Sequence, residues 1–101
     1  MYKVKITVVR KCCHHDLITR YENPIEHACD MNEGDVYVTD GLSCPDGLCE
    51  SAWLSISPYA LALAHGAKDF YNGWMKNPQS AMISCNDGFR PVSFLLEVIH
   101  E

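Results

Sequence analysis

Apolar and polar residues alternate in the first segment of the chain. Val4, Ile6 and Val8 fall on one side of an extended backbone, and two lysines and a threonine fall on the other. A period of two is typical of a half-buried strand. The pattern therefore predicts a strand over residues 2–10.

Short segments separated by turn signals follow this strand. A polar run over residues 11–16 ends it, and residues 17–21 suit one helical turn. Asn23-Pro24 is expected to stop that turn, because the residue before a proline disfavours helical backbone. β-Branched and aromatic residues at 36–39 predict a second short strand.

The most apolar stretch of the chain predicts a main helical segment over residues 48–65. One helical face carries Ala52, Trp53, Ile56, Ala60, Leu63 and Ala64. Leu54 and Leu61 lie elsewhere on the circumference, so the helix is apolar over more than half of its surface. A small domain cannot bury all of that surface, and the excess predicts a homodimer.

The same segment carries signals for its start, its middle and its end. Asp46 or Gly47 is expected to cap the helix. Ser57-Pro58 predicts a kink or a break, because proline lacks a backbone N–H. Gly66 is expected just beyond the last helical turn.

The last third of the chain predicts an aromatic loop followed by a hairpin. Residues 67–79 form the loop, 80–85 the first strand, and 86–89 a turn before the strand 91–100. Both faces of that strand are apolar, so we expect it to be central and covered on both sides. The fold class is therefore α+β, with one domain over residues 1–101. A small antiparallel or mixed sheet of about four strands packs against the main helix.

Charge and hydropathy exclude two classes of partner. The net charge is −5 with only 8 lysines and arginines. This balance predicts that the protein does not bind nucleic acid and has no cationic surface that binds membranes. The longest apolar run, Tyr59–Ala64, is far shorter than the roughly 20 residues of a membrane-spanning helix. Lysines also interrupt the first segment, unlike the apolar region of a signal peptide. We expect a cytoplasmic protein, in which the 6 cysteines are thiols, metal ligands or redox groups.

Four of the cysteines suggest a metal site. Cys44 and Cys49 flank a turn that contains proline and glycine, a spacing compatible with metal binding. Cys29 and Cys85 complete a four-thiolate set if their segments meet the start of the helix. Such a set suits zinc or an iron–sulfur cluster. The alternative is that all four are buried free thiols that act as small hydrophobic residues.

Cys49 is also a candidate catalytic residue, with Cys44 as its resolving partner. The positive end of a helix favours a thiolate, whereas the negative charges of Asp46 and Glu50 oppose one. A catalytic thiol also needs a base. The histidines available to supply it are His14, His15, His27 and His65.

Two further groups of residues suggest binding. Cys13 and His15 lie two residues apart in the run Cys12-Cys13-His14-His15, so they face the same way and can bind a transition metal. Adventitious binding in an exposed loop is the simpler interpretation of that run.

Arg90 follows an Asp87-Gly88 turn and can bind a carboxylate or phosphate in a bidentate fashion. The simpler alternative is an ion pair between Arg90 and Asp87 that fixes the turn. Trp53 and Trp74 are further ligand-binding candidates, and the alternative for these aromatic residues is that they close the core or an interface.

The segment from Cys85 to Phe94 reads C-x-D-G-x-R-P-V-x-F. This motif resembles the end of an uncharacterised family of small prokaryotic proteins. Segments 47–53 and 58–63, the Trp74-Met75 pair and a cysteine shortly before E-G-D also look like that family. The resemblance covers nearly all of the chain after residue 25.

The resemblance implies a site but brings no activity. The residues that it groups together are Cys29, Cys49, Cys85, Asp87 and Arg90. The Cys-Cys-His-His run lies outside the family pattern.

We expect a non-enzymatic binding or accessory protein whose cysteine cluster holds a metal or a small ligand. The alternatives are a thiol-dependent redox or transfer enzyme that uses Cys49, and a domain without chemistry of its own.

Overall fold

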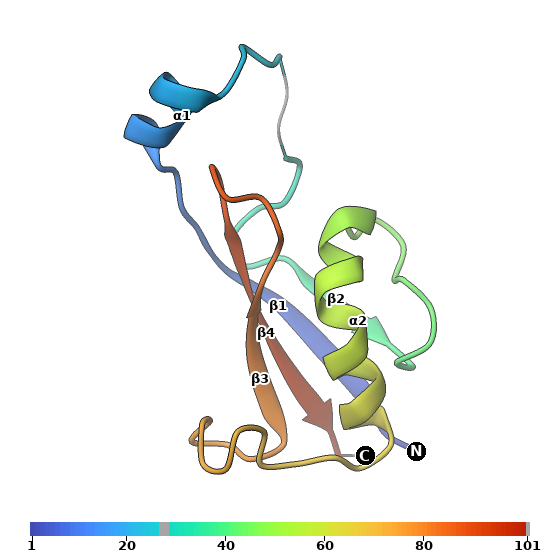
Figure 1. Cartoon of the computed structure of the whole chain (residues 1–101). Helices are drawn as coiled ribbons and strands as arrows, with labels where there is room; N and C mark the ends of the chain where they lie inside the picture. The colour runs from blue at the N-terminus through green and yellow to red at the C-terminus, as the bar shows by residue number, and fades with distance from the viewer. Residues whose placement is uncertain (27–28, 101) are drawn as a thin grey trace.

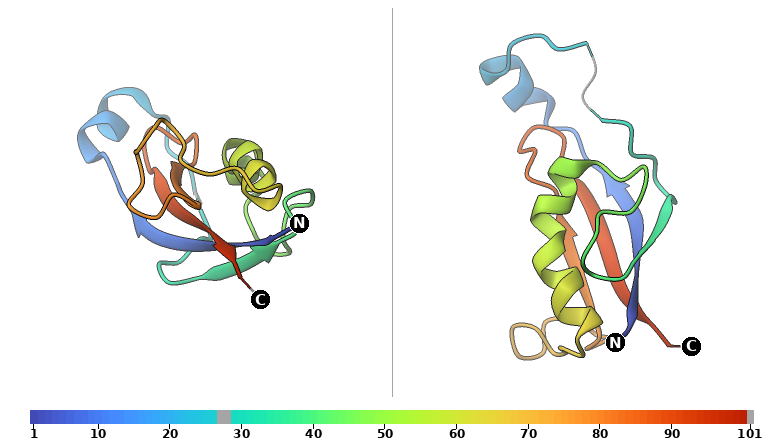
Figure 2. Two further views of the ribbon diagram at one scale, coloured as in Figure 1. Left: turned by 90° about the horizontal axis from the view of Figure 1, so that it is seen from below. Right: turned by 90° about the vertical axis from the view of Figure 1, so that its right-hand side faces the viewer.

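A computed structural model describes residues 1–26 and 29–100. Its elements follow one another as β1 (Lys3–Lys11), α1 (His15–Tyr21), β2 (Val36–Thr39), α2 (Glu50–Ala64), β3 (Ser80–Ser84) and β4 (Val92–Ile99). The strands form one sheet in the order β2-β1-β4-β3, and every neighbouring pair is antiparallel. α2 lies across one face of this sheet (Figure 1 and Figure 2). The predicted α+β fold is confirmed.

The core lies between α2 and one face of the sheet. Val4, Ile6 and Val8 of β1 are buried, as the alternating pattern predicts. In the register of the central pair, Ile6 lies beside Leu96 and Val8 beside Phe94. The helix contributes the face that the spacing indicated, with Ala52, Ile56, Ala60, Leu63 and Ala64 buried.

α2 runs from Glu50 to Ala64 without a break, although Pro58 lies inside it. Pro58 and Leu54, four residues earlier, are both exposed, so water can reach the Leu54 carbonyl for which Pro58 has no N–H. Because that side of the helix faces solvent, the expected break into two helices does not occur.

The two ends of α2 differ in how well the sequence predicts them. The N-cap is Cys49, not Asp46 or Gly47, and its side chain makes no capping hydrogen bond. At the other end, Gly66 has a φ of 90° and donates its N–H to Leu63. Ala67 donates to Ala62, which completes a Schellman motif. Gly66 is therefore placed as predicted.

The second face of the sheet carries no helix in the part of the chain that the structure describes. Val36 and Val38 of β2 are exposed there, and Lys5 of β1 pairs with Glu97 of β4 at 3.7 Å. β4 is central, as predicted, but the expectation that both of its faces are covered is wrong. Leu95 on this face is only half-buried, because α2 packs on the opposite face.

The molecule has two different ends. α1 and its flanking loops project beyond one end of the sheet, and both termini lie near the other end (Figure 1). None of the helices in residues 1–26 and 29–100 is long and apolar enough to cross a membrane.

Candidate functional site

A cavity of about 90 Å³ lies where the start of α2 meets the connection between β3 and β4. Cys29, Cys49 and Cys85 line it, each from a different segment. The rest of its wall consists of Ser51, Ala52, Asn86, Asp87, Arg90 and Val92. All five residues that the resemblance groups together therefore lie on the wall of one cavity.

Two of the three thiols are held by the backbone. The sulfur of Cys29 accepts the N–H of Met31 at 3.3 Å, and the sulfur of Cys85 accepts the N–H of Val92 at 3.3 Å. Sulfur is a weak acceptor, so these bonds orient the thiols more than they stabilise the fold. Both side chains are only partly buried, which leaves them accessible from the cavity.

The third thiol, that of Cys49, is exposed. As the N-cap residue of α2, it lies at the positive end of the helix dipole. Because it makes no capping hydrogen bond, its sulfur is not engaged by the first turn of the helix.

The turn that carries Asp87 forms one side of the cavity. The Oδ1 of Asp87 accepts the N–H groups of Phe89 and Arg90, at 2.8 and 3.1 Å. Ser51 in the first turn of α2 donates its hydroxyl to the Oδ1 of Asn86 at 3.0 Å. These bonds fix the turn internally and attach it to the helix.

Arg90 pairs with Glu22, not with Asp87. Its guanidinium lies 2.8 Å from one carboxylate oxygen of Glu22 and 3.1 Å from the other. The hydrogen bond to Glu22 raises the pKa of Arg90, and the charges of Glu22, Cys13 and Asp87 act in the same direction. The expected ion pair with Asp87 is therefore replaced, because the Asp87 carboxylate already accepts two backbone N–H groups.

Cys44 lies outside the cavity. It lines a separate hollow with Thr39, and its sulfur donates to the carbonyl oxygens of Pro45 and Leu48. Burial raises the pKa of the Cys44 thiol, and the negative charges of Glu50, Cys49 and Asp46 add to the effect.

The predicted four-thiolate site is therefore not assembled, because Cys44 faces its own turn. Within residues 1–26 and 29–100, no group of three or more His, Cys, Asp or Glu side chains is placed to hold a metal ion. The four-thiolate set expected for zinc or an iron–sulfur cluster is therefore not present among these residues.

The two tryptophans also lie away from the cysteines. Trp53 lines a hollow with Leu42, Pro58 and Leu61 on the outer side of α2. Trp74 belongs to the aromatic loop and packs edge-to-face on Tyr71, with ring centroids 5.3 Å apart. Neither tryptophan shares a wall with Asp87 and Arg90.

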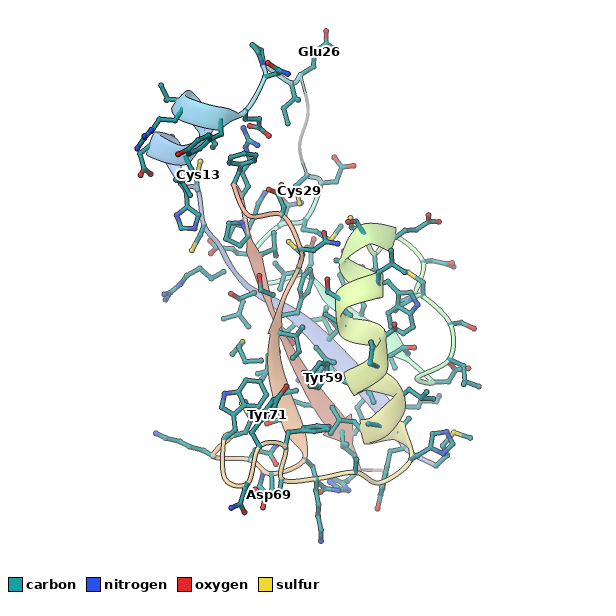
Figure 3. The ribbon with its side chains drawn as sticks, viewed as in Figure 1. Cys13, Glu26, Cys29, Tyr59, Asp69 and Tyr71 are labelled. Carbon is teal, nitrogen blue, oxygen red and sulfur yellow. The ribbon has the colours of Figure 1, made fainter. Side chains whose placement is uncertain are left out.

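The aromatic loop packs against the helix. The hydroxyls of Tyr59 and Tyr71 lie 2.7 Å apart, and Phe70 packs edge-to-face on Tyr59. Figure 3 shows Tyr59 and Tyr71 facing each other, away from Cys29. Asp69 and Tyr71 have positive φ values of 59° and 55°, so these contacts also hold a strained backbone. Tyr59 and Phe70 pack against the core, whereas Tyr71 and Trp74 remain exposed.

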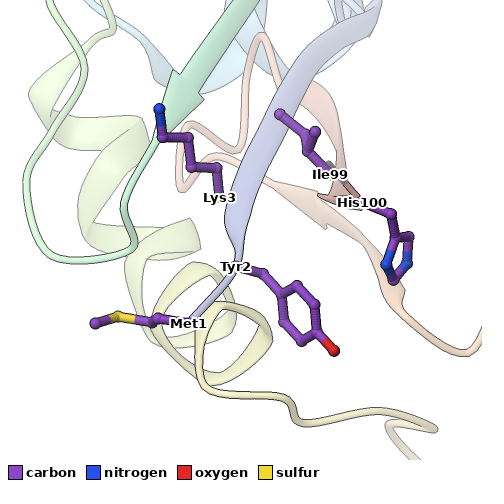
Figure 4. A pocket seen from close by; sticks show the side chains of 5 residues that line it. All are labelled: Met1, Tyr2, Lys3, Ile99 and His100. Carbon is purple, nitrogen blue, oxygen red and sulfur yellow. The ribbon is translucent and has the colours of Figure 1, made fainter.

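A larger hollow of about 310 Å³ lies beside the termini (Figure 4). Tyr2 and His100 form one side of it, with ring centroids 5.4 Å apart. Its other lining residues are Met1, Lys3 and Ile99. The described residues of this wall include neither a thiol nor a carboxylate, so they offer less chemistry than the cysteine-lined cavity.

His14, His15 and His65, three of the histidines expected to assist Cys49, are not on the wall of its cavity. No imidazole appears among the described residues that line it. His27 lies outside the described residues. His15 instead contacts Cys13, with its Nδ1 3.7 Å from the sulfur.

Comparisons with known proteins provide no relative for this chain. No protein-family model matches it, and searches of curated proteins and of solved structures give no match. The case for a function therefore depends on the geometry of the cavity and the chemistry of its wall.

Proposed function

We propose that the protein is a non-enzymatic binding or accessory protein whose cysteine-lined cavity holds a small ligand. One observation supports this proposal above the others. Cys29, Cys49 and Cys85 come from three segments far apart in the sequence and line a single cavity of about 90 Å³. Since one water takes up about 30 Å³ of liquid volume, the ligand has only a few non-hydrogen atoms.

The wall favours a small, polarisable ligand that carries negative charge. Sulfur is a soft, polarisable atom, and the start of α2 presents the positive end of the helix. Arg90 also lines the cavity, with its guanidinium held by Glu22. The carboxylate of Asp87 would repel an anion. This repulsion is reduced because its Oδ1 accepts two backbone N–H groups of its own turn.

The direct test is native mass spectrometry of protein purified without an affinity tag or a chelator, with plasma emission spectrometry for metals. We expect a bound species of small mass that denaturation releases. Cys49→Ser and Cys85→Ser should each remove it, because both side chains line the cavity. Cys44→Ser is the matched control and should retain it. Protein that carries no bound species, or equal retention in all three variants, would contradict the proposal.

A second candidate function is thiol-dependent redox or transfer chemistry at Cys49. The observation that favours it is the exposed N-cap position of Cys49, whose sulfur makes no capping bond. This function predicts that one thiol alkylates at pH 6 much faster than the other five. Uniform, slow labelling of all the cysteines would exclude it.

We place the protein in the cytoplasm. The support is that each of the cysteines is a free thiol, the state that a reducing compartment maintains. Fractionation of cells followed by detection with an antibody would test this placement.

A further inference from the structure

A second thiol site lies outside the cavity, at the junction between β1 and α1. The sulfur of Cys13 lies 3.7 Å from Nδ1 of His15, and both residues are exposed. Figure 3 shows Cys13 beside α1, at the same end of the molecule as Cys29. Cys13 is not among the residues that line the cavity, so the two thiol sites are separate.

The backbone fixes Cys13 in place. Cys12 donates its N–H to Pro91 at 2.9 Å, and His14 donates its N–H to Phe89 at 2.9 Å. These two bonds extend the antiparallel pairing of β1 and β4 beyond the strand ends, and Cys13 therefore lies opposite Arg90.

One basic group contacts the sulfur of Cys13. The imidazole of His15 is within hydrogen-bond distance. Arg90 lies across the strand pairing from Cys13, and its guanidinium is held by Glu22. Thiols next to basic residues react as thiolates more readily than isolated thiols.

We propose that Cys13 is a nucleophilic thiol with His15 as its base, and that it exchanges with low-molecular-weight disulfides. Nδ1 of His15 takes the thiol proton, and the sulfur attacks one sulfur of the disulfide. A new S–S bond forms as the bond within the disulfide breaks, and the imidazolium returns the proton to the departing thiolate. The products are a mixed disulfide on Cys13 and one free thiol, so no further oxidant is needed.

The neighbouring residues provide matched controls. Cys12 is also exposed but makes no side-chain hydrogen bond within the described residues, and no side-chain hydrogen bond joins His14 to a sulfur there. Cys12→Ser leaves Cys13 as the only thiol of the pair, whereas Cys13→Ser leaves Cys12.

The experiment is to add oxidised glutathione at pH 7 and follow the mixed disulfide on the tryptic peptide 12–20 by mass spectrometry. In the Cys12→Ser chain, Cys13 should react about tenfold faster than Cys12 does in the Cys13→Ser chain, well within the usual effect of a positioned base. His15→Asn in the Cys12→Ser chain should reduce the rate to that of Cys12. His14→Asn in the same chain should leave it unchanged.

Two outcomes would overturn the proposal. Equal rates for Cys12 and Cys13 would show that the thiol is not activated, and this comparison keeps both histidines intact. An equal loss in the two histidine variants would show that His15 does not act as the base. Far-UV circular dichroism of each variant checks that the fold is retained.

Discussion

Arg90 and Glu22 join two segments that lie 68 residues apart in the sequence. The contact is bidentate, with nitrogen–oxygen distances of 2.8 and 3.1 Å, and both side chains are largely buried. Glu22 is the C-cap residue of α1, and Arg90 lines the cysteine cavity. The pair therefore attaches α1 to the wall of the candidate site.

Glu22→Gln should loosen α1 while leaving the sheet intact. Removing the charge weakens the attachment, and we expect the amides of α1 to exchange about two- to fivefold faster, the range for an ion pair of ordinary strength. Hydrogen exchange measured by mass spectrometry gives this ratio. The control is Glu26→Gln, at an exposed position further along the same segment. The amides of α1 should exchange in this variant as they do in the wild type. Unchanged exchange in Glu22→Gln would show that α1 is held by other contacts.

Cys44 should be the slowest cysteine to alkylate at pH 8. Its pKa is raised above 9.0 by burial and by the negative charges around it, so its thiolate fraction is below that of an ordinary thiol. Site-resolved labelling with iodoacetamide measures the order. Labelling of Cys44 at the rate of Cys49 would contradict this prediction.

The same shift predicts how stability depends on alkaline pH. Well below pH 9.0 the Cys44 thiol is protonated in both the folded and the unfolded state and has no effect on the pH dependence. As the pH approaches and passes 9.0, the unfolded chain ionises first, so stability falls until the pH passes the folded-state pKa. Cys44→Ser should therefore lose less stability than the wild type between pH 8.5 and about 10. Urea unfolding at several pH values tests this, and parallel curves would exclude it.

Gly41→Ala should destabilise the protein far more than Gly34→Ala. Both glycines have positive φ, 90° and 93°, so both variants strain the backbone. A Cβ added at Gly41 would lie 2.7 Å from the Cβ of Ala64 on α2. A Cβ added at Gly34 would have no atom within 4 Å. We expect losses of about 1 kcal/mol for Gly34→Ala and about 3–5 kcal/mol for Gly41→Ala. Equal losses in urea unfolding would show that the loop can move away from the helix.

The expected homodimer stays a prediction, and the exposed side of α2 is where it can be tested. Leu54 is 72% exposed and Leu61 is 41% exposed, beside Leu42 at 64%. Leu54→Lys should weaken self-association at least about tenfold in sedimentation equilibrium, as loss of a central apolar contact does. Val36→Lys, on the uncovered face of the sheet, is the control. A dimer that only Val36→Lys disrupts would move the interface to the sheet, and a monomeric wild type would exclude the dimer.

The sequence predicts the elements of this fold because each of them has a local signal. The alternation of Val4, Ile6 and Val8 and the position of Gly66 depend only on neighbouring residues. The N-cap at Cys49 was missed, because the turn before it closes through a backbone bond between Pro45 and Leu48 that any residue can make.

The candidate site is less predictable, because its contacts are distant in the sequence. Ser51 and Asn86 are 35 residues apart, and no local pattern at either position indicates the other. The spacing of Cys44 and Cys49 indicates that the two thiols are near each other but not that Cys44 faces its own turn. The other three cysteines belong both to the expected four-thiolate set and to the residues that the resemblance groups, and whether they meet depends on how the loop and the hairpin reach the helix.

The strand order also has a consequence for synthesis on the ribosome. The central pair joins β1 to β4, with Val4 beside Val98. In a growing chain, β1 can therefore pair only with β2 until residues 92–99 have emerged. Closing the long loop between β1 and β4 slows folding. Nascent chains stalled before β4 should be protease-sensitive, and the thiols that are partly buried in the folded protein should be open to alkylation. The cavity, which needs Cys85 and Arg90, is then among the last features to assemble.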